Sequence, residues 1–152
     1  MRDNFQKAIE FVLPWEGYKT DDPRDPGKLT IWGISVVYHP VEVARMVKMS
    51  KEEAMKYASK LYLEKYWIPS GCDFLPCPKD MVLFDIAINP GPGLAGSLRA
   101  GEGTWQDWLF KRIEYYSNRV KKNPAKLVFL RGWINRTLAL RDLIERINDQ
   151  NH

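Results

Sequence analysis

The stretch from Lys79 to Ile88 constrains the fold of this chain most strongly, because nearly all of its residues from Met81 onward are apolar. Asp85 is the one charge inside that apolar run. A segment of this length that is apolar on every side predicts a buried helix rather than a surface helix. We therefore expect a mainly α-helical domain in which other elements pack around this central helix.

The rest of the chain carries the apolar spacing, start signals and breakers of helices joined by loops. The expected helices cover residues 4–13, 40–47, 51–66, 104–120 and 124–147. Ser50 and Glu53 have the spacing of a capping box, which marks the start of one of them. The glycine-rich residues 91–103 are expected to form a link, and the β-branched and aromatic residues 30–38 indicate a small β-hairpin or a buried turn.

Length and composition favour one soluble domain. The chain has 152 residues, and 45% of them are hydrophobic, which is enough for one continuous core. A net charge of +4 predicts attraction to acidic polymers, either nucleic acid or cell-wall material. Charges interrupt every apolar run, so neither a signal peptide nor a membrane span is predicted. Cys72 and Cys77 are too few for a disulfide scaffold, and we expect free thiols, although a bridge between them stays open.

The chemistry that remains after elimination is carboxylate chemistry. His39 and His152 lack a histidine or cysteine partner at ligand spacing, which argues against metal sites and against Ser-His or Cys-His catalysis. No phosphate-binding glycine motif is present either. By contrast, Glu16 lies within residues 14–17, where the first helix is expected to end, and Asp25 lies in the Pro/Gly/Asp loop that follows.

Two carboxyl groups arranged in this way are typical of a glycosidase, which uses one as a general acid and the other to activate water or attack the sugar. Burial beside an aromatic residue such as Trp15 favours the protonated form that an acid needs, whereas a polar loop keeps a carboxylate ionised. Glu16 is therefore the candidate acid and Asp25 its partner, with the Thr30 hydroxyl placed to orient a water. Glu16 as an exposed helix-end charge and Asp25 as a turn former remain the structural alternatives.

This part of the sequence resembles the Glu-Gly-Gly-Tyr, Asp-Pro-Gly-Gly-x-Thr and Gly-Ile signature of the glycoside hydrolase family 108 muramidases, a family of phage endolysins and secretion activator proteins. The resemblance runs from Glu16 to Ile34 without a gap and continues at three later segments. These segments are Leu61 to Trp67, Phe84 to Asn89 and Asn123 to Arg136. Tyr18, Lys19 and Lys28 depart from the signature, which affects the loop shape but leaves both carboxyl groups in place.

The resemblance implies a lysozyme-like single domain. Residues 1–90 would form its catalytic part, and residues 91–152 would form a C-terminal helical part like the family's peptidoglycan-binding segment. It also implies N-acetylmuramidase activity on peptidoglycan, with Glu16 as the catalytic acid. Flat aromatic and polar side chains are the candidate sugar contacts, namely Tyr18, Trp32, Trp67, Asp85 and Asn89. For Asp85 and Asn89, four residues apart on one helix face, a buried structural network is an equal alternative.

Two other functions stay open on this sequence. One is a lytic transglycosylase that cleaves the same bond and releases a ring-closed anhydro sugar. The other is a non-catalytic wall-binding or secretion-assisting protein that keeps the fold. In each case we expect a monomer that binds peptidoglycan glycan strands, with no metal, no cofactor, no nucleic acid and no membrane insertion. Because no export signal is predicted, the protein is expected to stay in the cytoplasm until it is released to the wall.

Overall fold

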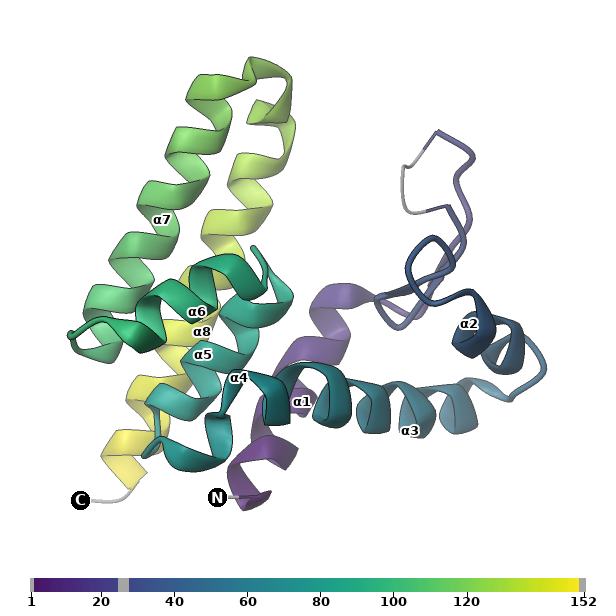
Figure 1. The fold of residues 1–152 in the computed structure, drawn as a ribbon, viewed down its shortest axis with the longest axis horizontal. Coiled ribbons are helices and arrows are strands. Elements are labelled where there is room, and N and C mark those ends of the chain that lie inside the picture. The colour runs from purple at the N-terminus through teal and green to yellow at the C-terminus, as the bar shows by residue number, and fades with distance from the viewer. Residues whose placement is uncertain (1, 25–27, 151–152) are drawn as a thin grey trace. The chain divides into compact units, whose positions relative to one another are not determined.

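The protein is mainly α-helical, as the sequence predicts (Figure 1). It also contains a small antiparallel sheet. The computed structural model describes residues 2–24 and 28–150. The chain divides into two compact units, Arg2–Pro69 and Ser70–His152. The expected division at residue 90 separates a catalytic part from a peptidoglycan-binding part and comes from the family resemblance. It concerns function, whereas the boundary at residues 69 and 70 divides the chain by its internal contacts.

The unit Arg2–Pro69 combines helices with a three-stranded sheet. Its elements are α1 (Arg2–Glu16), β1 (Lys19–Thr20), β2 (Thr30–Ile31), β3 (Ile34–Ser35), α2 (Pro40–Met46), α3 (Lys51–Tyr62) and a π-helical turn, η1 (Leu63–Trp67). The sheet order is β1-β2-β3, and both pairings are antiparallel. Ile31 pairs with Lys19 on one side and with Ile34 on the other. The expected hairpin therefore exists and gains a third strand.

Local signals explain where the helices of this unit begin and end. The Ser50 side chain accepts a hydrogen bond from the Glu53 backbone at 3.2 Å, and the Glu53 carboxylate accepts one from the Ser50 backbone at 2.8 Å. This is the predicted capping box, and α3 starts directly after it. Gly17 follows α1 with a φ of +73°, a left-handed conformation that commonly terminates a helix.

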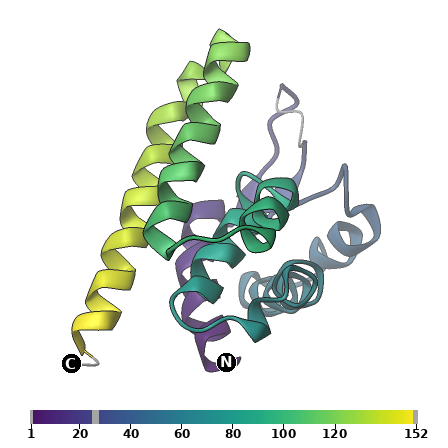
Figure 2. The ribbon, with the colours of Figure 1, turned by 60° about the vertical axis from the view of Figure 1, so that its left-hand side comes forward.

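The unit Ser70–His152 is built around the predicted central helix. Its elements are η2 (Cys72–Phe74), α5 (Lys79–Ile88), α6 (Pro92–Ala100), α7 (Trp105–Lys122), the 3-10 turn η3 (Pro124–Lys126) and α8 (Leu127–Gln150), and the short α4 (Ile68–Ser70) leads into it. Every residue of α5 from Asp80 to Ala87 is buried. Helices α7 and α8 lie antiparallel as a long hairpin, and both views show its joining turn far from α5 and α6 (Figure 2).

Residues 91–103 are not only a link, because α6 forms within them. Pro92 occupies the first turn of α6, where the missing backbone N–H costs nothing. Ala95 and Leu98 are buried while the helical glycines face outward, so packing against α5 outweighs the low helix propensity of glycine. The many glycines of this segment indicated a loop, so the sequence did not reveal that Ala95 and Leu98 hold a helix against α5.

The structure also bears on the two cysteines and on the expectation of no membrane span. Cys72 and Cys77, both within the described residues, are not joined by a disulfide. Burial raises the pKa of the Cys72 thiol to about 12, which disfavours the thiolate form that reacts as a nucleophile. Among the described helices, none has the length and apolar character that crossing a membrane requires.

Candidate active site

Glu16 is the last residue of α1 and is half-buried. The helix ends there because Gly17 turns left-handed and its backbone N–H donates to the Leu13 carbonyl at 3.0 Å. Pro14 lies inside the last turn without breaking the helix. The position that the sequence predicts for Glu16, at a helix end before a loop, is the position that the structure shows.

A two-residue turn between β2 and β3 packs against Glu16. Trp32 and Gly33 form this turn with φ values of +48° and +80°, the sign pattern of a type I′ hairpin turn. A Cβ atom added to Gly33 would lie 2.9 Å from both Cβ and Cγ of Glu16, so only glycine fits at this approach. The turn therefore fixes one side of the Glu16 side chain.

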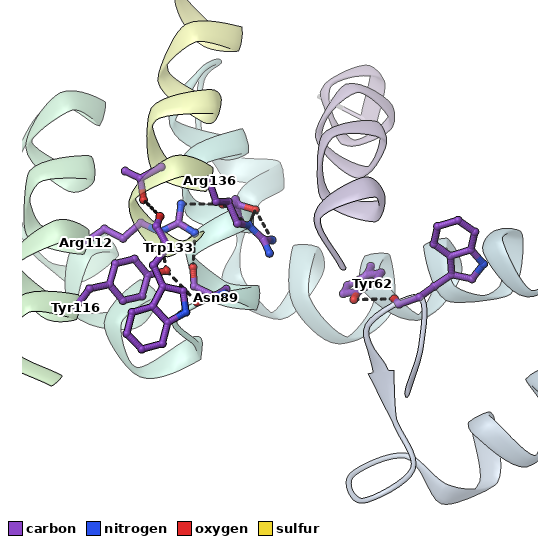
Figure 3. Close-up of polar contacts among 9 residues, drawn as sticks. Tyr62, Asn89, Arg112, Tyr116, Trp133 and Arg136 are labelled. Atoms are coloured by element: carbon purple, nitrogen blue, oxygen red, sulfur yellow. Dashed lines mark hydrogen bonds and ion pairs between the residues drawn. The ribbon is translucent and has the colours of Figure 1, made fainter. Parts of the chain in front are cut away.

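Trp32 has a left-handed backbone conformation that a bulky aromatic residue rarely adopts. Three hydrogen bonds hold it there. Its backbone N–H donates to the Tyr18 carbonyl at 2.6 Å, its carbonyl accepts from the Tyr62 hydroxyl at 3.0 Å (Figure 3), and its indole N–H donates to the Lys51 carbonyl at 3.2 Å. Such an over-determined strained residue is frequent at active sites, and here it adjoins the Glu16 turn.

The π-helical turn η1 brings Tyr66 close to Glu16. Burial, and then the negative charge of Glu16, raise the pKa of the Tyr66 hydroxyl, so Tyr66 remains a neutral hydrogen-bond donor. Its ring centroid lies 5.4 Å from that of Tyr62, one helical turn earlier. Single π-helical turns often occur at functional sites, which agrees with this placement.

Tyr18 and Trp32 form an aromatic pair beside the turn, with ring centroids 5.4 Å apart. The Lys51 ammonium lies 5.4 Å from the Tyr18 ring and 5.8 Å from the Trp32 ring, within cation–π range of both. Tyr18 is 36% exposed, whereas Trp32 is 9% exposed. Of the two predicted sugar contacts, Tyr18 therefore has the more accessible ring.

A mainly apolar groove lies along α1 and α3 in the same unit, and Trp32 borders it. Its other lining residues are Gln6, Ile9, Glu10, Leu13, Pro14, Met55, Lys56 and Ser59. The groove thus follows the helix that ends at Glu16.

Asp25 and Thr30 are the two residues predicted to act with Glu16. Asp25 lies outside the described residues. Thr30 lies on β2, half-buried, and its hydroxyl donates a long hydrogen bond of 3.4 Å to the Lys28 carbonyl. Lys28 itself has a φ of +49°, which places a strained residue in the loop at one of the departures from the family signature.

The prediction that Trp67 contacts the sugar is wrong for this structure, because the Trp67 side chain is completely buried. Its ring packs edge-on against Phe5 with centroids 5.4 Å apart. The large apolar area of a tryptophan makes this burial favourable, and sequence alone does not distinguish a buried tryptophan from one that lines a cleft.

Asp85 and Asn89 belong to the buried network that was the structural alternative. Asp85 accepts hydrogen bonds of 2.7 Å from both Arg112 on α7 and Arg136 on α8. The Asn89 side-chain oxygen accepts from the Tyr116 hydroxyl at 2.8 Å, and its carbonyl accepts from Arg112 at 2.6 Å (Figure 3). With 1% of Asp85 exposed, its carboxylate has no surface to offer a sugar.

The charges of the two arginines determine the ionisation of this network. Burial raises the pKa of the Asp85 carboxyl, but the charges of Arg136 and Arg112 and their hydrogen bonds lower it more, so the net shift is downward. Asp85 is therefore an anion that joins α5 to α7 and α8. Both arginines lie far along the chain from Asp85, which is why the sequence did not reveal the pairing.

The sequence profile of glycosyl hydrolase 108 matches residues 9–91, a range that includes Glu16, the turn at Trp32 and Gly33, and the helix of Asp85. The chain belongs to this family. It is therefore a glycosidase of a peptidoglycan-related, lysozyme-like class. The C-terminal residues from 92 onward lie beyond the matched range.

A solved structure supports the fold assignment along nearly the whole chain. The structure of Brucella abortus SagA has a TM-score of 0.69 and 23% sequence identity, and the match covers 96% of each chain. At this identity the likeness concerns the fold alone. No curated protein sequence matches the chain.

The sequence did not single out Tyr62, Tyr66 or Lys51 as parts of this site. The spacing of Tyr62 and Tyr66 was an available signal, since residues four apart share one helix face. Lys51 gave no such signal, because a lysine in the first turn of a helix is usually a solvated charge.

Proposed function

We propose that this protein is an N-acetylmuramidase of the endolysin type that cleaves peptidoglycan between N-acetylmuramic acid and N-acetylglucosamine. The observation that carries the proposal is the fixed side chain of Glu16, held at a helix end by the strained turn of Trp32 and Gly33. A general acid must be positioned within hydrogen-bond reach of the leaving oxygen, and a rigid support provides that precision.

In the proposed reaction, Glu16 donates its proton to the glycosidic oxygen as the bond between that oxygen and the anomeric carbon breaks. A water molecule then adds to the anomeric carbon and loses a proton to the partner carboxylate. The sequence supports Asp25 for that second role, with Thr30 beside the water. The nearby Tyr66 hydroxyl, kept neutral, is available to donate a hydrogen bond to the Glu16 carboxylate once the proton has left.

The exposed part of the Tyr18 ring is the best-supported sugar contact. Tyr18 lies two residues after Glu16, and its ring packs against the strained Trp32. Flat aromatic faces bind the apolar faces of sugar rings. We propose that Tyr18 supports the sugar next to the cleaved bond.

Glu16→Gln tests the role of the acid. Clearing of a purified peptidoglycan suspension should fall to background, because an amide keeps the shape of Glu16 but has no proton to donate. Glu114→Gln is the matched control, since Glu114 is exposed on α7 and does not line the groove beside Trp32. Clearing by Glu16→Gln at the rate of the Glu114→Gln control would refute the proposal, provided both variants show the native circular dichroism spectrum.

Product mass separates hydrolysis from the transglycosylase alternative. Hydrolysis adds one water to the products, whereas a lytic transglycosylase releases an anhydro sugar that lacks it. Asp25→Asn sharpens the comparison, because loss of the group that activates water should stop hydrolysis. Anhydro products from the unaltered protein would overturn the hydrolytic assignment while keeping Glu16 as the acid.

Accumulation in the cytoplasm until release to the wall remains part of the proposal. After release, the positive charge that accompanies a sequence pI of about 9.0 would favour association with an anionic wall.

A further inference from the structure

The turn between α7 and α8 carries a surface that the proposed hydrolysis does not use. We define residues 119–131 as the hairpin tip. Within it, the first three residues of α8 expose large apolar side chains: Leu127 is 60% exposed, Val128 is 78% exposed and Phe129 is 51% exposed. Consecutive helical residues point in different directions around the axis, so these three side chains surround the end of the helix. Contiguous exposed apolar groups of this kind mark interaction sites.

The hairpin tip is also strongly basic. It contains Arg119, Lys121, Lys122, Lys126 and Arg131. The sequence has no aspartate or glutamate between Glu114 and Asp142, so no carboxylate of the hairpin tip offsets this charge. Lys121, Lys122 and Arg131 are exposed. The apolar side chains therefore sit in a positive field.

The aromatic contacts that join α7 to α8 at this end of the hairpin leave Leu127 and Val128 exposed. Tyr116 and Trp133 stack across α7 and α8 with centroids 4.7 Å apart (Figure 3), and Arg119 lies 5.5 Å above the Trp133 ring. Phe129 reaches the edge of this cluster, 5.8 Å from Trp133, and the Lys126 ammonium lies 5.5 Å from the Phe129 ring. Leu127 and Val128 lie beyond the cluster and face outward.

From this combination we infer that the hairpin tip binds the surface of a bilayer rich in anionic phospholipid. Leu127, Val128 and the outer face of Phe129 enter the boundary between headgroups and acyl chains, and the lysines and arginines contact the phosphates. Lysine stems can lie along the apolar boundary while their ammonium groups stay in water. Such contact reaches about 5–10 Å into the interface, so it requires no membrane-crossing helix. This proposal departs from the expectation of no membrane insertion, because the hairpin tip would enter the bilayer interface without any helix spanning the membrane.

Other occupants fit these observations less well. A hydrated acidic wall polymer satisfies the cations but leaves the three apolar side chains in water. A second hairpin tip satisfies the apolar groups but brings like charges together. An anionic bilayer satisfies both, because it presents negative charge over an apolar layer.

Co-sedimentation of the full chain with sucrose-loaded vesicles tests the inference. We expect binding to vesicles of phosphatidylcholine mixed with phosphatidylglycerol, and at least tenfold weaker binding to phosphatidylcholine alone. Leu127→Ser with Val128→Ser removes the apolar part, and Lys121→Gln with Lys122→Gln and Lys126→Gln removes the charged part. Each set should weaken binding strongly, the second by about fivefold for each cation.

Matched controls make the same chemical changes away from the tip. Phe110→Ser removes an exposed apolar side chain from α7, where Phe110 is 71% exposed. Lys7→Gln with Lys48→Gln and Lys111→Gln removes equal charge from other exposed positions. Both controls should bind anionic vesicles almost as tightly as the unaltered protein, and every variant should keep its circular dichroism spectrum.

Three results would overturn the inference. One is absence of binding to anionic vesicles. Another is equal weakening by the tip and control substitutions, which would indicate net charge alone. The third is that vesicle binding requires the lysines but is unaffected by Leu127→Ser with Val128→Ser, and that the protein binds a soluble acidic polymer such as polyglutamate equally well. That result would indicate an acidic polymer as the partner. None of these results depends on the hydrolytic activity.

Discussion

Gly33 lies in direct contact with Glu16, and the space between them has no room for a methyl group. A Cβ on Gly33 would come within 2.9 Å of Cβ and Cγ of Glu16 and would overlap the Tyr62 hydroxyl. The strained turn that carries Gly33 therefore sets the position of the candidate catalytic acid.

Gly33→Ala should displace Glu16 and lower peptidoglycan clearing by about 100-fold, the effect of moving a reacting group by about 1 Å. Gly17→Ala is the matched control for backbone strain, because Gly17 has a similar φ of +73° but open space at its Cβ position. Strain alone costs about 1–2 kcal/mol of stability, so denaturant unfolding should show a larger loss for Gly33→Ala. Equal stability losses in the two variants would contradict the contact.

Tyr62→Phe should destabilise the protein by about 1–3 kcal/mol, because the Trp32 carbonyl loses a buried hydrogen bond. Clearing should fall as well, since that bond helps hold Trp32 in its left-handed conformation. Tyr57→Phe is the control, because its hydroxyl makes an exposed and long contact of 3.4 Å with Arg45. Urea unfolding and clearing rates check both effects, and a Tyr62→Phe variant as active and stable as Tyr57→Phe would show that the bond is dispensable.

Asp85→Asn should lower the free energy of unfolding by about 3–5 kcal/mol, because the buried charges of Arg112 and Arg136 would lose the Asp85 carboxylate that pairs with both. Asp142→Asn provides the comparison, since its ion pair with Arg141 is exposed to solvent and should contribute about 1 kcal/mol or less. Chemical denaturation measures both losses. Similar small losses would mean that water or another group compensates the arginines.

Acid should unfold the protein through the same carboxyl group. The pKa of Asp85 is lower in the folded protein than in the unfolded chain, where an aspartate titrates near about 3.9. Its stabilising contribution is therefore complete above about pH 4 and is lost as the pH falls toward the folded pKa. Urea midpoints measured from neutral to acid pH should decline more steeply for the unaltered protein than for Asp85→Asn. Parallel declines would assign acid unfolding to other groups.

Local signals in the sequence were sufficient for most helices and for the position of Glu16. The capping box at Ser50 and Glu53 and the apolar run after Lys79 act within one helix, so they could be read directly from spacing. The helix α6 within residues 91–103 could not be predicted from such local signals, because the burial of Ala95 and Leu98 depends on a neighbouring helix.

The sequence by itself determined the helical class, the end of α1 at Glu16 and the family signature that begins there. Tertiary structure decided which side chains surround Glu16, and it decided that Trp67 and Asp85 are buried rather than available to a sugar. The physical reason is that helix starts and ends depend on neighbouring residues. Burial, ion pairing and the strain at Trp32 depend on groups that meet only after the chain has folded, as Tyr62 meets Trp32 and Arg136 meets Asp85.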